Sequence, residues 1–188
     1  MYLEPGLKDW PGFAPDSSFK DSFSASVTFM NSGSTPVSII SSQFYISGDS
    51  ADMEDEIMGF RNPSGLNWKD SLWRFERVDS CFYLDNKAVS TVDFSCSLTH
   101  FSEEDFREFV LNSTTYSWMD ESDALLHVGL WLLMANPYGE YSIKLVPLGS
   151  PFYNRNSAMS KGASVIAFEQ ETMPTFRDLN HWEALKDK

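Results

Sequence analysis

Residues 24–46 read SASVTFMNSGSTPVSIISSQFYI, and this stretch decides the fold class. Ala25, Val27 and Phe29 alternate with serine and threonine, which places every second side chain on one apolar face. Such alternation is typical of a half-buried strand. The sequence NSG at 31–33 then supplies a turn, and a second apolar stretch follows. The pattern predicts two half-buried strands around a turn, and therefore an antiparallel sheet.

Similar strand patterns recur along the chain, separated by residues with turn chemistry. The strongest pair is a hairpin of 125–134 and 141–146, whose first arm is apolar on both faces, as expected of a central strand. In the second arm Ser142 and Lys144 alternate with apolar residues, so we expect that arm to be covered less completely. The other expected strands are 72–76, 81–84, 90–98 and 163–168.

Two short helices are predicted. Ser102 can cap a helix that runs to about Leu111, because acidic residues fill its first turn. A second helix opens at Pro174, and its apolar side chains recur every third residue. These side chains are Phe176, Leu179, Trp182 and Leu185.

The expected fold is mainly β, an antiparallel two-sheet sandwich with one short inserted helix and a C-terminal helix. We divide it into an arm at 1–22, a β-sandwich domain at 23–170 and an amphipathic C-terminal helix at 171–188. The arm mixes proline and glycine with aromatic side chains. We expect it to avoid regular structure and to lie extended on the body or on a partner.

Composition narrows the classes of function. The chain has 188 residues, 42% of them apolar, which is ample for one core. Its 14 basic residues face 27 acidic ones, a net charge of −13 that disfavours nucleic-acid binding. The longest apolar run, 124–135, is too short for a membrane helix, so no membrane is expected. The residues after Met1 lack a secretory signal, which predicts synthesis in the cytoplasm.

Cys81 and Cys96 are expected to be reduced thiols, with a disulfide as the alternative if their strands pair directly.

An acidic loop is the only metal candidate. A flexible loop rich in carboxylates suits calcium, but the spacing here matches no ordered calcium loop, and a solvated acidic loop is the favoured interpretation. Its acids are Asp49, Asp52, Glu54, Asp55 and Glu56.

The chain carries no pattern typical of an enzyme. His100, His127 and His181 lie too far apart in sequence to show metal-ligand spacing. His127 sits in the most apolar strand and is expected to be a core imidazole. No nucleophile elbow, phosphate loop or paired-cysteine motif is present, so no catalytic residue and no cofactor are predicted.

Aromatic side chains are the strongest interaction signal. The chain has six tryptophans, several of them in expected loops or at the ends, and tryptophan is a favoured anchor at interfaces. We expect the arm and the tail to dock onto a partner. The residues expected to do so are Trp10, Phe13, Phe19, Phe176, Leu179 and Trp182.

The sequence VTFMNSGSTPV at 27–37 resembles the opening strand, turn and strand of immunoglobulin-like modules found in many uncharacterised bacterial proteins. The resemblance covers about 24–98. It departs at Asp85-Asn86, where those modules carry a Pro-Gly turn. It implies a fold and brings no functional residues with it.

The expected function is a non-catalytic acidic interaction module, a subunit of a larger assembly such as a phage virion or a bacterial accessory complex. Its partner is a protein with a basic surface, or a second copy of the chain. One alternative is an acidic inhibitor that mimics nucleic acid through carboxylates at 49–56 and 103–105. Another is a hydrolase on a sandwich scaffold that uses His100 and His127.

Overall fold

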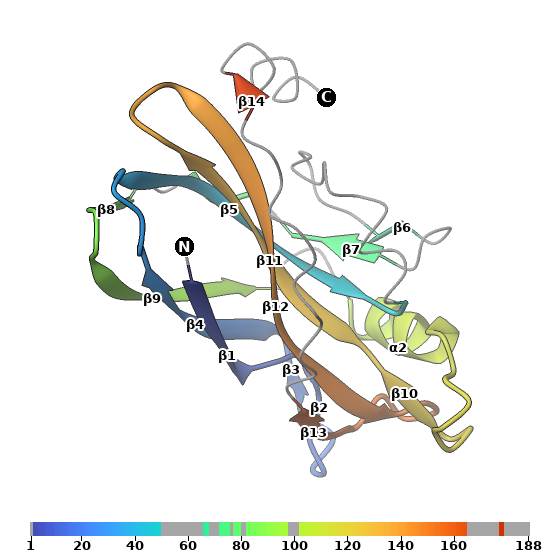
Figure 1. Ribbon diagram of the computed structural model, residues 1–188. Coiled ribbons are helices and arrows are strands. Elements are labelled where there is room, and N and C mark those ends of the chain that lie inside the picture. The colour runs from blue at the N-terminus through green and yellow to red at the C-terminus, as the bar shows by residue number, and fades with distance from the viewer. Residues whose placement is uncertain are drawn as a thin grey trace.

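The computed structural model describes residues 2–49, 66–67, 72–75, 77–79, 82–97, 102–164 and 177–178. Within these residues the chain is mainly β, with antiparallel sheets and one helix, α2 (Glu103–Asn112) (Figure 1). The strands are β1 (Tyr2–Asp9), β2 (Gly12–Phe13), β3 (Phe19–Lys20), β4 (Ser22–Met30), β5 (Val37–Ser47), β6 (Leu66–Asn67), β7 (Leu72–Arg74), β8 (Phe82–Leu84), β9 (Val89–Ser97), β10 (Asp123–Leu125), β11 (His127–Ala135), β12 (Glu140–Asn154), β13 (Ser160–Ser164) and β14 (Arg177–Asp178).

A three-stranded sheet has the order β1-β4-β9. In β4 the side chains of Phe23, Ala25, Val27 and Phe29 are fully buried, and the polar residues between them are half-buried. The alternation in the sequence therefore identified both the strand and its buried face correctly.

A nine-stranded sheet has the order β10-β12-β11-β5-β7-β6, with β13 and β14 also paired to β12 and β8 to β5. Strand β11 lies between β12 and β5, and every residue from His127 to Met134 is buried. The predicted central strand and its hairpin with β12 are confirmed. The short strands β2 and β3 form a separate two-stranded ribbon.

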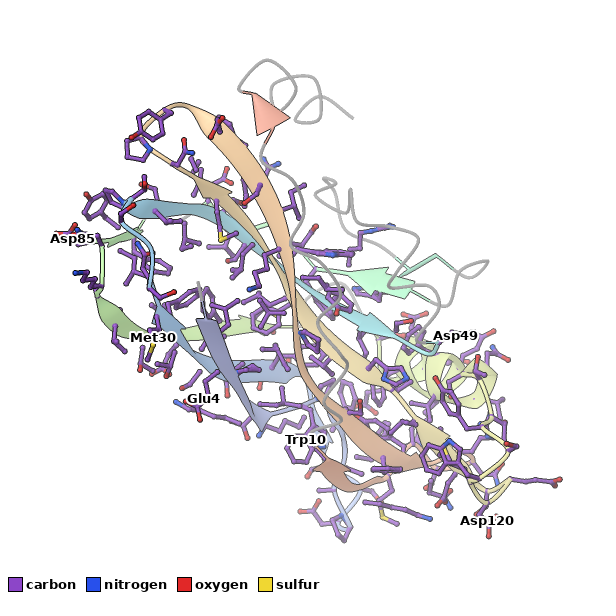
Figure 2. The ribbon with its side chains drawn as sticks, in the orientation of Figure 1. Glu4, Trp10, Met30, Asp49, Asp85 and Asp120 are labelled. Atoms are coloured by element: carbon purple, nitrogen blue, oxygen red, sulfur yellow. The ribbon has the colours of Figure 1, made fainter. Side chains whose placement is uncertain are left out.

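The turn after β4 carries the chain from one sheet to the other. Strands β4 and β5 belong to different sheets, so the two strands of the opening stretch do not pair. The buried Asn31 side chain fixes this crossing. Its amide nitrogen donates to the carbonyl oxygens of Thr35 and Asp85, and its Oδ1 accepts from the Gly33 N–H. Asp85, labelled in Figure 2, belongs to the connection between β8 and β9. The Asn31 side chain therefore ties together two crossings between the sheets.

Both sheets contribute side chains to one apolar core. Phe23 of β4 packs against Phe44 of β5 and against Phe75, with ring centroids 5.9 and 5.0 Å apart. Helix α2 adds Phe106 and Phe109 to the same core. A second cluster lies around the buried side chains of Tyr45, Trp131 and Leu133. Successive side chains of a strand point to opposite faces, so β11 is covered on both sides.

Strand β12 is less completely covered than β11, as expected, but its polar residues are the buried ones. Ser142 and Lys144 are each 4% exposed, whereas Ile143 and Leu145 between them are half-buried. Ser142 lies opposite Met134 and Lys144 opposite Leu132, and both of these partners belong to the main core. The polar side chains of β12 therefore lie on the core side of the sheet.

The expectation that residues 1–22 avoid regular structure is wrong for β1, which pairs with β4 from Tyr2 to Asp9. Pro5 obscured this strand in the sequence, because proline is excluded from central strands but tolerated at a sheet edge. Strand β1 occupies such an edge, and Leu3, two residues before the proline, is buried in the core.

The helix after Ser102 is confirmed, with a complete capping box. The Ser102 Oγ accepts from the Asp105 N–H at 3.1 Å, and the Asp105 carboxylate accepts from the Ser102 N–H at 2.9 Å. The predicted C-terminal helix is not confirmed. Arg177-Asp178 instead form β14, paired with Tyr141 and Glu140 of β12, and the rest of that segment lies outside the described residues.

Gly129 leaves room for an aromatic ring on the central strand. It lies directly opposite Tyr45 in the register, and a Cβ atom at position 129 would overlap the Tyr45 ring. We expect Gly129→Ala to lower the free energy of unfolding by about 2 kcal/mol or more, because the fully buried ring has no room to retreat. Urea unfolding measures this. Gly6→Ala is the matched control, since its Cβ would meet only the Ser26 carbonyl oxygen at 3.8 Å. Equal losses for the two variants would contradict the packing described.

Burial of the Lys144 side chain without a carboxylate partner among the described residues is unfavourable for its charge. Burial lowers the pKa of Lys144, and no ion pair offsets it among the described residues. We therefore expect Lys144→Met, which keeps the length of the side chain, to raise the free energy of unfolding by about 1 kcal/mol. The exposed Lys87→Met is the control and should change it by less than about 0.5 kcal/mol. A destabilised Lys144→Met variant would show that the ammonium is stabilised where it lies.

Candidate functional site

The three aromatic residues of the predicted arm are used inside the molecule. Phe13 is 3% exposed, and its ring contacts Phe19 with centroids 4.9 Å apart. The Arg107 guanidinium lies 3.7 Å from the centre of the Phe13 ring. Trp10 donates from Nε1 to the Ser160 Oγ at 2.8 Å. The structure thus places these side chains against the body of the same chain. Phe176, Leu179 and Trp182 lie outside the described residues.

The acidic loop is described only at Asp49. Its Oδ2 accepts from the Thr114 Oγ1 at 3.1 Å, so this carboxylate is tied to the segment after α2. Asp52, Glu54, Asp55 and Glu56 lie outside the described residues. Elsewhere in the described part of the chain, no three His, Cys, Asp or Glu side chains gather as a metal site would require.

Cys96 is a free thiol on β9, and burial raises its pKa to about 12. A thiol with so high a pKa is protonated at neutral pH and is a poor nucleophile. Its possible partner Cys81 lies outside the described residues.

His127 is a hydrogen-bonded imidazole at the beginning of β11. Its Nε2 lies 2.8 Å from the Tyr116 hydroxyl and its Nδ1 lies 3.1 Å from the Ser150 Oγ. The imidazole is 2% exposed and Ser150 is fully buried. The expectation of a core imidazole is confirmed. His100 and His181 lie outside the described residues.

Burial keeps His127 neutral. It lowers the pKa of the imidazole to about 4, although the nearby charge of Asp49 acts in the opposite direction. The Ser150 hydroxyl next to it is sealed from solvent, so a substrate cannot reach this serine-histidine pair in the conformation described. The hydrogen bond with His127 instead fixes the position of Tyr116, which belongs to the segment between α2 and β10.

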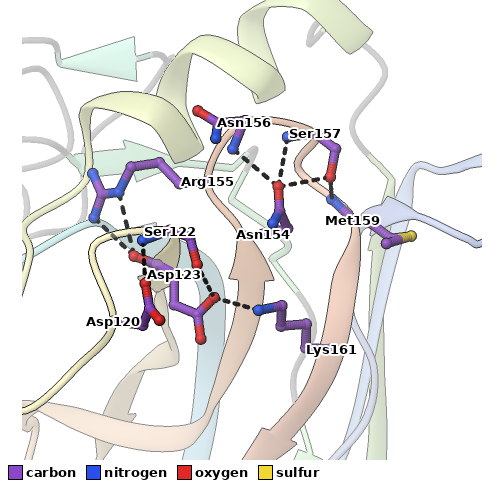
Figure 3. A network of polar contacts seen from close by, with 9 residues as sticks. All are labelled: Asp120, Ser122, Asp123, Asn154, Arg155, Asn156, Ser157, Met159 and Lys161. Carbon is purple, nitrogen blue, oxygen red and sulfur yellow. Dashed lines mark hydrogen bonds and ion pairs between the residues drawn. The ribbon is translucent and has the colours of Figure 1, made fainter.

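The Trp118 loop, residues 113–122, is fixed mainly by Arg155. The guanidinium donates from Nη1 to the carbonyl oxygens of Leu111 and Ser113, both at 2.9 Å, and from Nη2 to that of Asp123 at 3.0 Å. The Arg155 N–H also donates to the Ser122 carbonyl at 2.8 Å. Figure 3 shows this arginine with its partners in the Asp120–Asp123 turn. One side chain thus clamps both ends of the loop.

The loop holds a tryptophan at the surface. Trp118 is 63% exposed, yet its ring stacks on Tyr116 at 5.7 Å and meets Phe152 edge-on at 6.5 Å. Tyr116 is anchored in turn by its hydrogen bond to His127. An aromatic ring of this size is thus presented to solvent on a rigid support.

Carboxylates lie in the same loop as this ring. Asp120 and Glu121 are exposed in the same loop, and Asp120 appears at the lower right of Figure 2. Hydrogen bonds from the backbone and side chain of Ser122 lower the pKa of Asp120, which is ionised at neutral pH. Asp123 pairs with Lys161. The Trp118 loop therefore combines an apolar ring with an acidic border.

Sequence reasoning counted Trp118 among the tryptophans without selecting it. The available signal was Tyr116-Ser117-Trp118, an aromatic pair within a polar connection between a helix and a strand. Arg155 gave no signal, because its partners are carbonyl oxygens more than thirty residues away in the sequence.

No protein-family model matches the chain, and no curated protein matches it by sequence. Solved structures resemble it at low identity. A protein from Archaeoglobus fulgidus is 12% identical over 82% of this chain and 95% of its own, with a TM-score of 0.44. A Northeast Structural Genomics Consortium target is 7% identical over 93% and 94%, with a TM-score of 0.38. The putative ApaA protein from Bordetella pertussis is 14% identical over 80% and 91%, with a TM-score of 0.35. These neighbours are uncharacterised, mainly β proteins.

Among the residues that the structure describes, no helix has both the length and the apolar character needed to span a membrane.

The buried imidazole makes stability depend on pH. Its pKa is about 4 in the folded chain and about 6.5 when unfolded, so between these values only the unfolded chain binds the proton. We expect His127 to cost up to about 3 kcal/mol of stability as the pH falls from 6.5 to 4. Urea unfolding across this range should give a flatter pH profile for His127→Gln, which cannot titrate. Identical profiles for the variant and the natural chain would show that His127 accepts its proton without penalty.

Proposed function

We propose that this chain is a non-catalytic protein-interaction module that docks through Trp118, built on a β-sandwich of immunoglobulin-like type. The observation that carries the proposal is a tryptophan 63% exposed on a loop clamped by Arg155. The core shared by the two sheets supports the sandwich. The immunoglobulin-like type rests on the resemblance of residues 27–37 alone.

An exposed tryptophan on a rigid support suits binding for energetic reasons. Burying the ring against a partner removes a large apolar surface from water, and tryptophans are prominent among residues that dominate interface energies. Stacking on Tyr116 already restricts the rotation of the ring, so the side chain loses little further conformational entropy on binding. Tyr116 and Phe152 cover only part of the ring, because Trp118 remains 63% exposed. The exposed remainder is what a partner pocket would cover.

The acidic border indicates the chemistry of the partner. Asp120 and Glu121 are exposed two and three residues after Trp118, and the chain as a whole carries a net charge of −13. A pocket that is apolar inside and lined with lysine or arginine at its rim complements this surface. Such a partner fits the role of a subunit in a larger assembly, whether a virion or a bacterial accessory complex.

The other candidate functions have less support. For nucleic-acid mimicry, two of the four described acids, Asp49 and Asp105, already accept hydrogen bonds within the chain. For hydrolysis, the pair of Ser150 and His127 is buried. Docking through the predicted arm would need Phe13 to leave the core.

Photo-crosslinking in the cells that naturally make the protein tests the proposal. A benzophenone amino acid at position 118 should capture one recurrent protein, which mass spectrometry identifies. The same group at Tyr83, which is 61% exposed on β8, is the matched control and should not capture it. With the purified partner, Trp118→Ala should weaken binding at least about 30-fold, the loss expected of a central anchor.

Charge is tested in the same assay. Asp120→Asn with Glu121→Gln should weaken binding at low salt and make little difference at high salt, because exposed charges are screened. Equal capture at positions 118 and 83, or unchanged affinity of Trp118→Ala, would rule out docking through Trp118.

A further inference from the structure

Strand β9 forms an edge of the three-stranded sheet. Within the described part of the chain β4 is its only partner, in a register that runs without a bulge from Ser22↔Ser97 to Met30↔Val89. One backbone hydrogen bond shows which residues of β9 direct their N–H and C=O groups toward β4. The Asn31 N–H donates to the Ala88 carbonyl at 3.0 Å, so the pair that continues this register is a hydrogen-bonded one.

Hydrogen-bonded and non-hydrogen-bonded pairs alternate in an antiparallel ladder. Ser90, Val92, Phe94 and Cys96 therefore direct their backbone groups toward β4. The odd-numbered residues from Val89 to Ser97 direct their N–H and C=O groups away from it. The same odd-numbered residues are exposed in the burial pattern of the strand. As far as the described residues show, strand β9 thus offers an unpaired row of backbone donors and acceptors along this edge.

The opposite edge of the sheet is blocked. In β4 the even-numbered residues bond to β1, so Leu3, Pro5 and Leu7 are the positions of β1 whose backbone points outward. Pro5 has no N–H to offer at the middle of that edge, and β1 also lies against β12. Edge strands are commonly protected by proline or lysine. Strand β9 contains neither.

We propose that the β9 edge takes up an extended segment of a partner protein as an added strand, with a lysine or arginine of that segment opposite Asp93. Main-chain hydrogen bonds to the five outward-directed residues supply affinity, as in other cases of strand addition. Apolar residues at alternate positions of the segment would lie beside the half-buried Val92 and Cys96.

Charge selects the occupant. Asp93 is the only charged residue of β9, and it lies at the centre of the edge. Its Oδ1 accepts from Lys8 Nζ at 2.7 Å and also contacts the Ser26 hydroxyl. The interactions of this carboxylate with other side chains all use Oδ1, so Oδ2 remains available to a cation on the added strand. A basic residue there gains a charged pair across the strands.

The same charge disfavours a second copy of the chain. The antiparallel pairing that uses all of β9 places Asp93 directly opposite Asp93 of the other copy, which is repulsive. Two chains of net charge −13 also repel one another as a whole.

The test uses the full-length ¹⁵N-labelled protein and a capped octapeptide in which threonine and valine alternate, with one central threonine replaced by lysine. Addition of the peptide should shift the amide resonances of Thr91, Asp93 and Ser95, and should slow their exchange with deuterium. A matched peptide with glutamate in place of lysine should bind about fivefold or more weakly at low salt.

Proline variants distinguish loss of binding at the β9 edge from loss of folding stability. The Ser95 N–H points outward, so Ser95→Pro should keep the urea midpoint close to that of the natural chain and abolish peptide binding. The Ser90 N–H points to β4, so Ser90→Pro should lower the midpoint clearly. In Asp93→Asn the preference for the lysine peptide should disappear.

Three results would overturn the proposal: shifts that map to residues other than β9, no shift at millimolar peptide, or unchanged binding to Ser95→Pro. A mass that rises with concentration in the natural chain but not in Ser95→Pro would assign the edge to a second copy instead. The β9 edge shares no residue with the Trp118 loop. A negative result for peptide binding at β9 therefore leaves the proposed docking through Trp118 untouched, and a negative result for Trp118 leaves the β9 proposal untouched.

Discussion

The covering of β11 on both faces is the constraint on which the rest of the structure depends. The strand is hydrogen-bonded to β12 on one side and β5 on the other, and it has apolar clusters on both faces. A segment in this position must satisfy its backbone within the sheet and its side chains within the two clusters. Gly129 shows how tight this fit is, because the Tyr45 ring occupies the space that a Cβ would need.

The candidate binding loop depends on the same strand. His127 begins β11, and its position is set by the ladder to Ser47 of β5. From there the contacts run outward to Tyr116 and then to Trp118. A buried polar group that makes its hydrogen bonds is specific about geometry, because misplacing either partner leaves an unsatisfied group. The exposed ring thus takes its position from the interior of the molecule, through two side chains.

The sequence was sufficient where the signal is local. Alternation identified β4, the continuous apolar run identified β11, and Ser102 with the acids after it identified the start of α2. The sequence was insufficient where the structure depends on contacts between residues far apart in the chain. Alternation shows that one face is buried but does not name the partner strand, so the separation of β4 from β5 was not predictable. Likewise, nothing near Trp118 indicates that Arg155 holds it in place.

The order of the strands has a consequence for synthesis on the ribosome. Strands β4 and β5 emerge early, but β9 and β11, with which they pair, follow much later in the chain. Among the described strands made before β9, only β1 pairs with β4. The apolar residues of β5 therefore remain without their main partner strand until the hairpin of β11 and β12 has been synthesised. Unpaired strands of this kind make a nascent chain prone to misfolding and aggregation. The chain has to reach its stable form late, when its central strand is finally translated.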